Sequence, residues 1–142
     1  MIIHKLLDIF NYKSEYQKKD SNILSNDMYV LERIYFNKKI TISDISKKYN
    51  IAPSTLTGIV DRLENKKLIK RYRTEEDRRT VNLSITKEGD IVIKKHIKED
   101  EIFSKNFFKS LETNKRESLK KLLLELLENI KKEELFLEDK KK

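Results

Sequence analysis

The segment that most constrains the fold is residues 53–65, because its apolar side chains recur at helical spacing. The positions i, i+3, i+4 and i+7 carry Leu56, Ile59, Val60 and Leu63. This spacing predicts an amphipathic helix with one buried side. Small or polar residues collect on the opposite side and its flanks, namely Ser54, Thr55, Thr57, Gly58, Asp61, Arg62 and Asn65. Glycine costs about 1 kcal/mol relative to alanine inside a helix. Core packing cannot explain a glycine at position 58 on that side, whereas close approach of this face to another surface can. The alternative is that residues 53–65 form an ordinary surface helix without a binding role.

A shorter helix is predicted just before this one. Thr41 begins the sequence Thr-Ile-Ser-Asp, which matches a capping box with Asp44 at the N3 position. Ile45 and Tyr49 then form an apolar stripe of about two turns. Pro53 suits the first position of the next helix, because its missing N–H needs no partner there. Two short helices joined by a tight turn, the second with a polar outer face, are typical of a helix-turn-helix.

A β-hairpin is predicted directly after the helices. Residues 68–73 carry β-favouring side chains, and residues 80–86 alternate strictly between apolar and polar side chains. The polar connection at 74–79 is long enough to project from the two strands. The segment is therefore typical of a wing beside the helices.

The tip of this hairpin carries Asp77, Arg78 and Arg79. An arginine at a projecting tip can enter a minor groove of DNA, where the electrostatic potential is negative. We assign this role to Arg79, and we expect the carboxylate of Asp77 to hold it in position. The alternative is a solvated surface ion pair, which contributes about 0–1 kcal/mol.

Basic residues gather between the second helix and the hairpin tip. Within eight residues and without one acid stand Lys66, Lys67, Lys70, Arg71 and Arg73. Phosphates of a DNA backbone would pass there. The whole chain has 32 Lys and Arg against 24 Asp and Glu. The resulting net charge of +8 favours a polyanionic partner. The alternative for any individual lysine is that it reflects a generally lysine-rich composition and not a DNA contact. The predicted DNA-binding residues are Ser54, Thr55, Thr57, Gly58, Arg62, Lys66, Lys70, Arg73, Asp77, Arg78 and Arg79.

Four motifs in fixed order resemble the MarR family of bacterial transcription regulators. They are Ala-Pro-Ser-Thr-Leu-Thr-Gly-Ile-Val-Asp-Arg-Leu-Glu, Leu-Ile-Lys-Arg, Asp-Arg-Arg and Leu-Ser-Ile-Thr-Lys-Glu-Gly. The resemblance is dense over residues 27–89 and looser over the rest of the chain. It implies a homodimer whose recognition helices occupy two major grooves and whose wings reach the adjacent minor grooves, with Asp77 and Arg79 in the wing's Asp-x-Arg motif. Ala52 departs from the pattern, because many members place a hydroxyl cap there.

The expected fold class is mainly α with a small antiparallel β-hairpin (α+β), a winged helix-turn-helix with N- and C-terminal dimerisation helices. Within one unit, 1–142, we expect a DNA-binding lobe at 25–92 and a helical dimerisation region at 1–20 and 93–138. Apolar stripes near both ends support this division, with a break expected near residues 110–114. Any helical bundle has such stripes, so the dimer follows mostly from the resemblance. A symmetric dimer predicts a near-palindromic operator.

The resemblance implies a sequence-specific transcriptional regulator of double-stranded DNA, which we expect to be a repressor. The alternative is a winged-helix architectural or protein-interaction module without effector control. Many members of the family bind small anionic compounds between the dimer helices and the DNA-reading lobe. The aromatic residues that could line such a site are Tyr12, Tyr16, Tyr29, Tyr35 and Phe36. The alternative for these aromatics is a place in the core.

Composition argues against several other classes of protein. The chain has no cysteine, which excludes disulfides, thiolate nucleophiles and cysteine-ligated metals. His4 and His96 do not stand in a metal-ligand cluster, and no phosphate loop or catalytic triad spacing is visible. We therefore expect no catalytic residue, metal or cofactor, and no enzyme. Without a secretory signal or a membrane-spanning segment, the protein is expected in the cytoplasm with no membrane partner.

Overall fold

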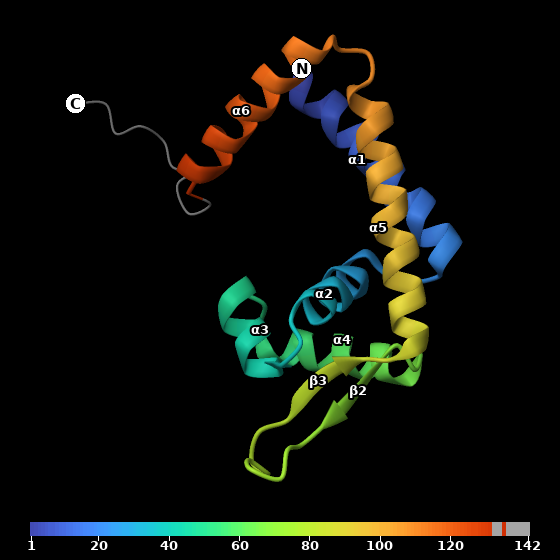
Figure 1. Cartoon of the computed structure of the whole chain (residues 1–142), viewed down its shortest axis with the longest axis vertical. Coiled ribbons are helices and arrows are strands. Elements are labelled where there is room, and N and C mark those ends of the chain that lie inside the picture. The colour runs from blue at the N-terminus through green and yellow to red at the C-terminus, as the bar shows by residue number, and fades with distance from the viewer. Residues whose placement is uncertain (132–134, 136–142) are drawn as a thin grey trace, which may run out of the picture. The chain divides into compact units, whose positions relative to one another are not determined.

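The computed structural model describes residues 1–131 and 135, and it contains the predicted helix-turn-helix (Figure 1). In chain order the elements are α1 (Ile2–Ser21), α2 (Ser25–Phe36), β1 (Ile40–Thr41), α3 (Ile42–Tyr49), α4 (Pro53–Asn65), β2 (Ile69–Tyr72), β3 (Asn82–Ile85), α5 (Lys87–Phe108) and α6 (Thr113–Asn129). The chain forms two compact units, Met1–Glu101 and Ile102–Lys142. The predicted class, mainly helical with a small antiparallel sheet, is confirmed.

The capping box at the start of α3 forms as predicted. The hydroxyl of Thr41 accepts a hydrogen bond from the backbone N–H of Asp44, and the Asp44 carboxylate accepts one from the backbone N–H of Thr41, both at 3.0 Å. The helix ends at Asn50 in the left-handed conformation, with φ 52°, which asparagine tolerates better than most residues. Pro53 is the first residue of α4, and the preceding Ala52 supplies no side-chain cap.

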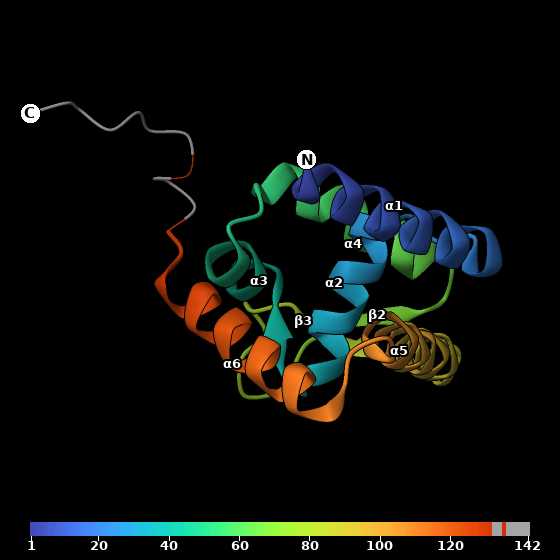
Figure 2. The ribbon, with the colours of Figure 1, turned by 90° about the horizontal axis from the view of Figure 1, so that it is seen from above.

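The apolar side of α4 is buried as its spacing predicts. Leu56, Val60 and Leu63 are fully buried, and Ile59 is nearly so. They belong to a core shared with α2, α3 and the sheet. In both views α2 lies between α3 and the first part of α5 (Figure 1 and Figure 2). Because α4 packs on this layer through one face only, its polar face is left outward.

The sheet has three antiparallel strands in the order β1-β3-β2, one more than the predicted hairpin. The added strand is β1, in which Ile40 pairs with Leu83 of β3 and is itself buried. Two residues are too short for any periodicity to show, so the sequence gives no sign of this strand. The predicted hairpin is confirmed as β2 and β3, and its loop extends away from the helices (Figure 1).

The unit Ile102–Lys142 contains the end of α5 and the whole of α6. The two helices are separated between Phe108 and Thr113, which confirms the predicted break. No described residue of α6 is buried, and its exposed leucines are Leu122, Leu123, Leu124, Leu126 and Leu127. The predicted dimerisation region runs to residue 138, so its residues 132–134 and 136–138 lie outside the described part of the chain. Among the described helices, none has both the length and the apolar character needed to cross a membrane.

Candidate nucleic-acid interface

The outer face of α4 presents short hydroxyl side chains near its N-terminus. Ser54, Thr55 and Thr57 are exposed, as the helical spacing predicts. The hydroxyl of Thr57 donates to the carbonyl of Pro53 at 2.9 Å, so its oxygen keeps only acceptor capacity for another molecule. Since Ala52 provides no side-chain cap, the first backbone N–H groups of α4 remain available to outside acceptors.

The two glycines of the chain occupy opposite environments. A Cβ added at Gly58 on α4 would approach only the Nη1 atom of Arg62, at 3.6 Å, an ordinary van der Waals distance. A Cβ added at Gly89 would lie 2.0 Å from the backbone oxygen of Leu68, which no packing adjustment of a side chain can relieve. The fold therefore requires glycine at position 89 and does not require it at position 58.

Arg62 on α4 forms an ion pair with Asp27 on α2, which the sequence did not predict. Its Nε and Nη2 atoms donate to the two carboxylate oxygens of Asp27 at 2.9 and 2.6 Å. Asp27 lies in the first turn of α2 and is 1% exposed, whereas the Arg62 side chain is 47% exposed. The bond to Asp27 raises the pKa of Arg62 further above its ordinary value. The two residues are 35 positions apart, so no local spacing could have revealed the pair.

Asp77 orders the wing loop by binding its backbone N–H groups, and no bond to the guanidinium of Arg79 is involved. One carboxylate oxygen accepts the backbone N–H of Arg79 at 2.9 Å and of Thr80 at 3.3 Å, and the other accepts the Thr80 hydroxyl. The bond from the Thr80 hydroxyl, followed by that from the Arg79 N–H, lowers the pKa of Asp77 below its ordinary value. Thus the contacts of Asp77 fix the main chain at Arg79 and leave the guanidinium of Arg79 exposed.

A second brace crosses the same loop. The Nη1 atom of Arg73, the residue directly after β2, donates to the carbonyl of Arg78 at 3.0 Å. Arg73 is therefore placed as a support of the wing, with Arg78 and Arg79 exposed beyond it. The loop also closes on itself through Thr74, whose hydroxyl accepts the backbone N–H of Asp77 at 3.2 Å.

The basic segment after α4 carries less uncompensated charge than its sequence suggests. Arg71 pairs with Asp61 and Glu64, which come from α4 and lie outside the basic stretch. The hydrogen bond to Asp61, followed by the charge of Glu64, raises the pKa of Arg71. Lys66 donates to the carbonyl of Asn22 at 3.1 Å, whereas Lys70 is exposed on β2. Lys70 is therefore an outward cation of this segment.

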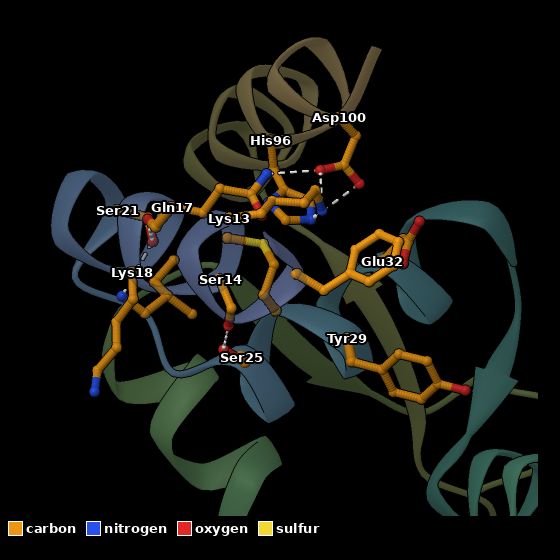
Figure 3. Close-up of a pocket in the computed structure, with 13 residues that line it drawn as sticks. Lys13, Ser14, Gln17, Lys18, Ser21, Ser25, Tyr29, Glu32, His96 and Asp100 are labelled. Carbon is orange, nitrogen blue, oxygen red and sulfur yellow. Dashed lines mark hydrogen bonds and ion pairs between the residues drawn. The ribbon is translucent and has the colours of Figure 1, made fainter. Parts of the chain in front are cut away.

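The five predicted effector-binding aromatics do not come together. A hollow of about 300 Å³ lies among α1, α2 and α5 (Figure 3), and Tyr29 alone of the five lines it. Tyr12, Tyr16 and Phe36 are 73, 59 and 60% exposed, so the alternative that these side chains belong to the core is wrong. Tyr35 is the one member that packs against the core.

A polar cluster at one end of that hollow was not predicted. Asp100 on α5 accepts hydrogen bonds from Lys13 at 2.7 Å and from Gln17 at 2.6 Å, both on α1 (Figure 3). Burial raises the pKa of Asp100, but the bonds from Lys13 and Gln17 outweigh burial and lower it overall. Below this cluster the hydroxyls of Ser14 and Ser25 lie 2.7 Å apart. The hollow therefore combines an apolar lining of Phe10, Ile23 and Met28 with polar side chains of α1.

Comparison with known proteins finds related sequences and a similar fold. The sequence model of the MarR family matches residues 25–81. The HTH-type transcriptional repressor MdtR of Bacillus subtilis (strain 168) is 39% identical over 64 residues, which cover 45% of this chain and 41% of MdtR. The uncharacterized HTH-type transcriptional regulator YfiV of the same organism is 29% identical over 123 residues, 84% of this chain and 76% of YfiV. The structure of Streptococcus pneumoniae FabT in complex with DNA superposes with a TM-score of 0.78 at 25% identity, covering 89% of this chain and 93% of FabT.

Proposed function

Residues 25–81 make this chain a member of the MarR family of transcriptional regulators, and from that premise we propose that it represses transcription by binding a near-palindromic operator as a homodimer. The observation that carries the proposal is the face of α4. Four buried apolar residues fix the helix to the core, while hydroxyls and Gly58 point outward beside an arginine-tipped wing. The repressor role is supported by the name of MdtR, and binding to DNA by the FabT complex.

We assign the roles on DNA by chemistry. Ser54, Thr55 and the acceptor oxygen of Thr57 face base edges and phosphates of the major groove. Arg78 and Arg79 reach the minor groove, and Asp77 fixes the loop that carries them. The remaining basic residues of the prediction, Lys66, Lys70 and Arg73, lie between these two regions.

Homodimerisation is supported by apolar surface at both ends of the chain. We assign residues 1–20 and 93–138 to the dimer region and residues 25–92 to the DNA-binding lobe. On α1, Ile2, Ile3 and Leu7 are more than half exposed. Within the unit Ile102–Lys142, a hollow of about 340 Å³ is lined by Phe108 and by leucines of α6. Patches of this kind on a soluble chain favour association. Two copies related by a twofold axis would present equivalent α4 helices to half-sites about 10 bp apart.

We propose the hollow of Figure 3 as the site of a small-molecule effector, because it is large enough for one and is lined by side chains of three helices. Lys18 supplies a cation, Ser14 and Ser25 supply hydroxyls, and Tyr29 supplies an aromatic edge. An effector bound there would contact α1, α2 and α5 together, so it could change the geometry of a dimer. Binding of trial compounds would raise the melting temperature, and Ser14→Val with Ser25→Val should remove that rise.

The proposal is tested by selecting bound duplexes from a random pool with the purified chain, while light scattering measures its mass. We expect an enriched inverted repeat and a mass of twice the monomer. Similar affinity for random and selected duplexes would contradict the proposal and would favour an architectural DNA-binding module.

A further inference from the structure

The contact between Arg62 and Asp27 leaves one particular edge of the guanidinium open. A guanidinium has five N–H donors in a plane. Asp27 engages the side edge formed by Nε and Nη2, at 2.9 and 2.6 Å. The end edge, formed by Nη1 and the outer N–H of Nη2, is not used by Asp27. That edge presents two parallel donors, the pattern that meets the O6 and N7 acceptors of guanine.

The charge of the pair argues for a base and against a phosphate as its partner. Asp27 is 1% exposed and neutralises Arg62 at hydrogen-bonding distance. The pair therefore attracts phosphate less than a lone arginine would, whereas its hydrogen-bond pattern is unchanged. The carboxylate also removes rotamer freedom from a long side chain, which lowers the entropy lost on binding.

The place of the guanidinium on α4 agrees with such a role. Its Nη1 atom lies beside Gly58, 3.6 Å from where a Cβ would stand, one turn nearer the N-terminus than Arg62 itself. Gly58 therefore places no side chain beside this edge. The half-exposed side chain is thus fixed on its inner side and accessible on its outer side.

We propose that Asp27 is a positioning residue that holds Arg62 so that its end edge reads one guanine in each half-site. This inference rests on the proposed function, because it requires the outer face of α4 to lie in a major groove. It adds a specificity-determining residue on α4 and assigns its support to a residue of α2.

The test compares base preferences of the full-length chain and its variants. Asp27→Asn replaces one acceptor by an N–H donor, which breaks the paired geometry. Arg62→Lys keeps the ion pair with the buried carboxylate but loses the planar guanidinium with its two parallel donors. It therefore tests guanine recognition even if Asp27→Asn does not fold. In duplexes carrying each base at each position, wild type should prefer guanine at one half-site position by roughly 5- to 150-fold. Both variants should reduce that preference to less than about 3-fold and keep the preferences at other positions.

Lys70→Ala is the matched control, since Lys70 is an exposed cation with no part in the pair. It should lower affinity on all duplexes and keep the guanine preference. Folding of each variant is checked by its melting curve. An unchanged guanine preference in folded Asp27→Asn or Arg62→Lys, or an equal loss on all duplexes, would overturn the inference. A wild type without any base preference would instead overturn the proposed function.

Discussion

Replacement of Gly58 by alanine separates what the fold needs from what the proposed interface needs. In the free protein the new methyl group would meet only Nη1 of Arg62, at 3.6 Å, so no clash is expected. Position 58 lies inside the 13-residue helix α4, where alanine is favoured over glycine by about 1 kcal/mol. Gly58→Ala should therefore stabilise the protein by about 0.5–1 kcal/mol and raise its melting temperature by roughly 2–8 °C.

The same methyl group should weaken operator binding. If α4 lies against base edges, the added group has to be accommodated in a closely packed interface, which costs about 1–3 kcal/mol, or roughly 5- to 150-fold in affinity. Urea denaturation measures the stability, and fluorescence anisotropy with a labelled operator measures the affinity. A variant that is both more stable and less active on DNA is the expected result.

Gly89→Ala provides the contrast. Its Cβ would lie 2.0 Å from the Leu68 carbonyl and 2.7 Å from a side-chain carbon of Ile85, so the junction of β3 and α5 has to shift. We expect a loss of stability of about 1–3 kcal/mol. For Gly58→Ala, operator affinity equal to that of wild type would refute the argument that this face of α4 approaches DNA. A lower stability of Gly58→Ala would refute the conclusion that the free protein has room for a methyl group at position 58.

Three further predictions concern charge. Arg79→Ala should weaken operator binding by about 1–3 kcal/mol in an electrophoretic mobility shift assay and leave the mass in light scattering unchanged; unaltered affinity at physiological salt argues against a groove contact by the wing. Lys70→Ala should reduce the slope of log affinity against log salt by about one unit, and a slope equal to that of wild type would exclude a phosphate contact. The pKa of Asp100 lies below its ordinary value of 3.8, so its contribution to stability is present above pH 3.8 and is lost as the pH falls through the lowered pKa. Urea unfolding should then show a weaker dependence on acid pH in Asp100→Asn than in wild type, and identical profiles would contradict this role.

Local sequence rules predict the helices and turns of the DNA-reading region well, because each depends on residues close in the chain. The capping box at Thr41, the placement of Pro53 at the start of α4 and the break before Thr113 all follow from spacing or from one residue's chemistry. The strand β1 does not, since two residues carry no periodic signal and the strand exists only by pairing with β3.

The candidate site is less predictable than the fold, because its polar contacts join distant segments. Arg71 stands in a stretch without acids, but the turn after α4 brings it back to Asp61 and Glu64. Asp27 precedes Arg62 by 35 residues and shares no local pattern with it. From the sequence, only the charge of Arg62 or Arg71 is known. The structure adds the acid that pairs with each arginine, and this acid limits which other groups the arginine can contact.

These partners divide the arginines and lysines of the region into two groups. Arg62 and Arg71 are paired with acids, so their orientation is fixed and their long-range field is weakened. Lys70 and Arg79 carry outward charge, which Lys70 can place against phosphates and Arg79 can place in a minor groove. Residues of the first group are suited to discriminate between sequences, and residues of the second to supply affinity that falls with salt. The five basic residues at 66–73 therefore overstate the number of cations that this region can offer to phosphates, because Arg71 is paired with Asp61 and Glu64. The salt dependence of operator binding should reflect the smaller, outward group.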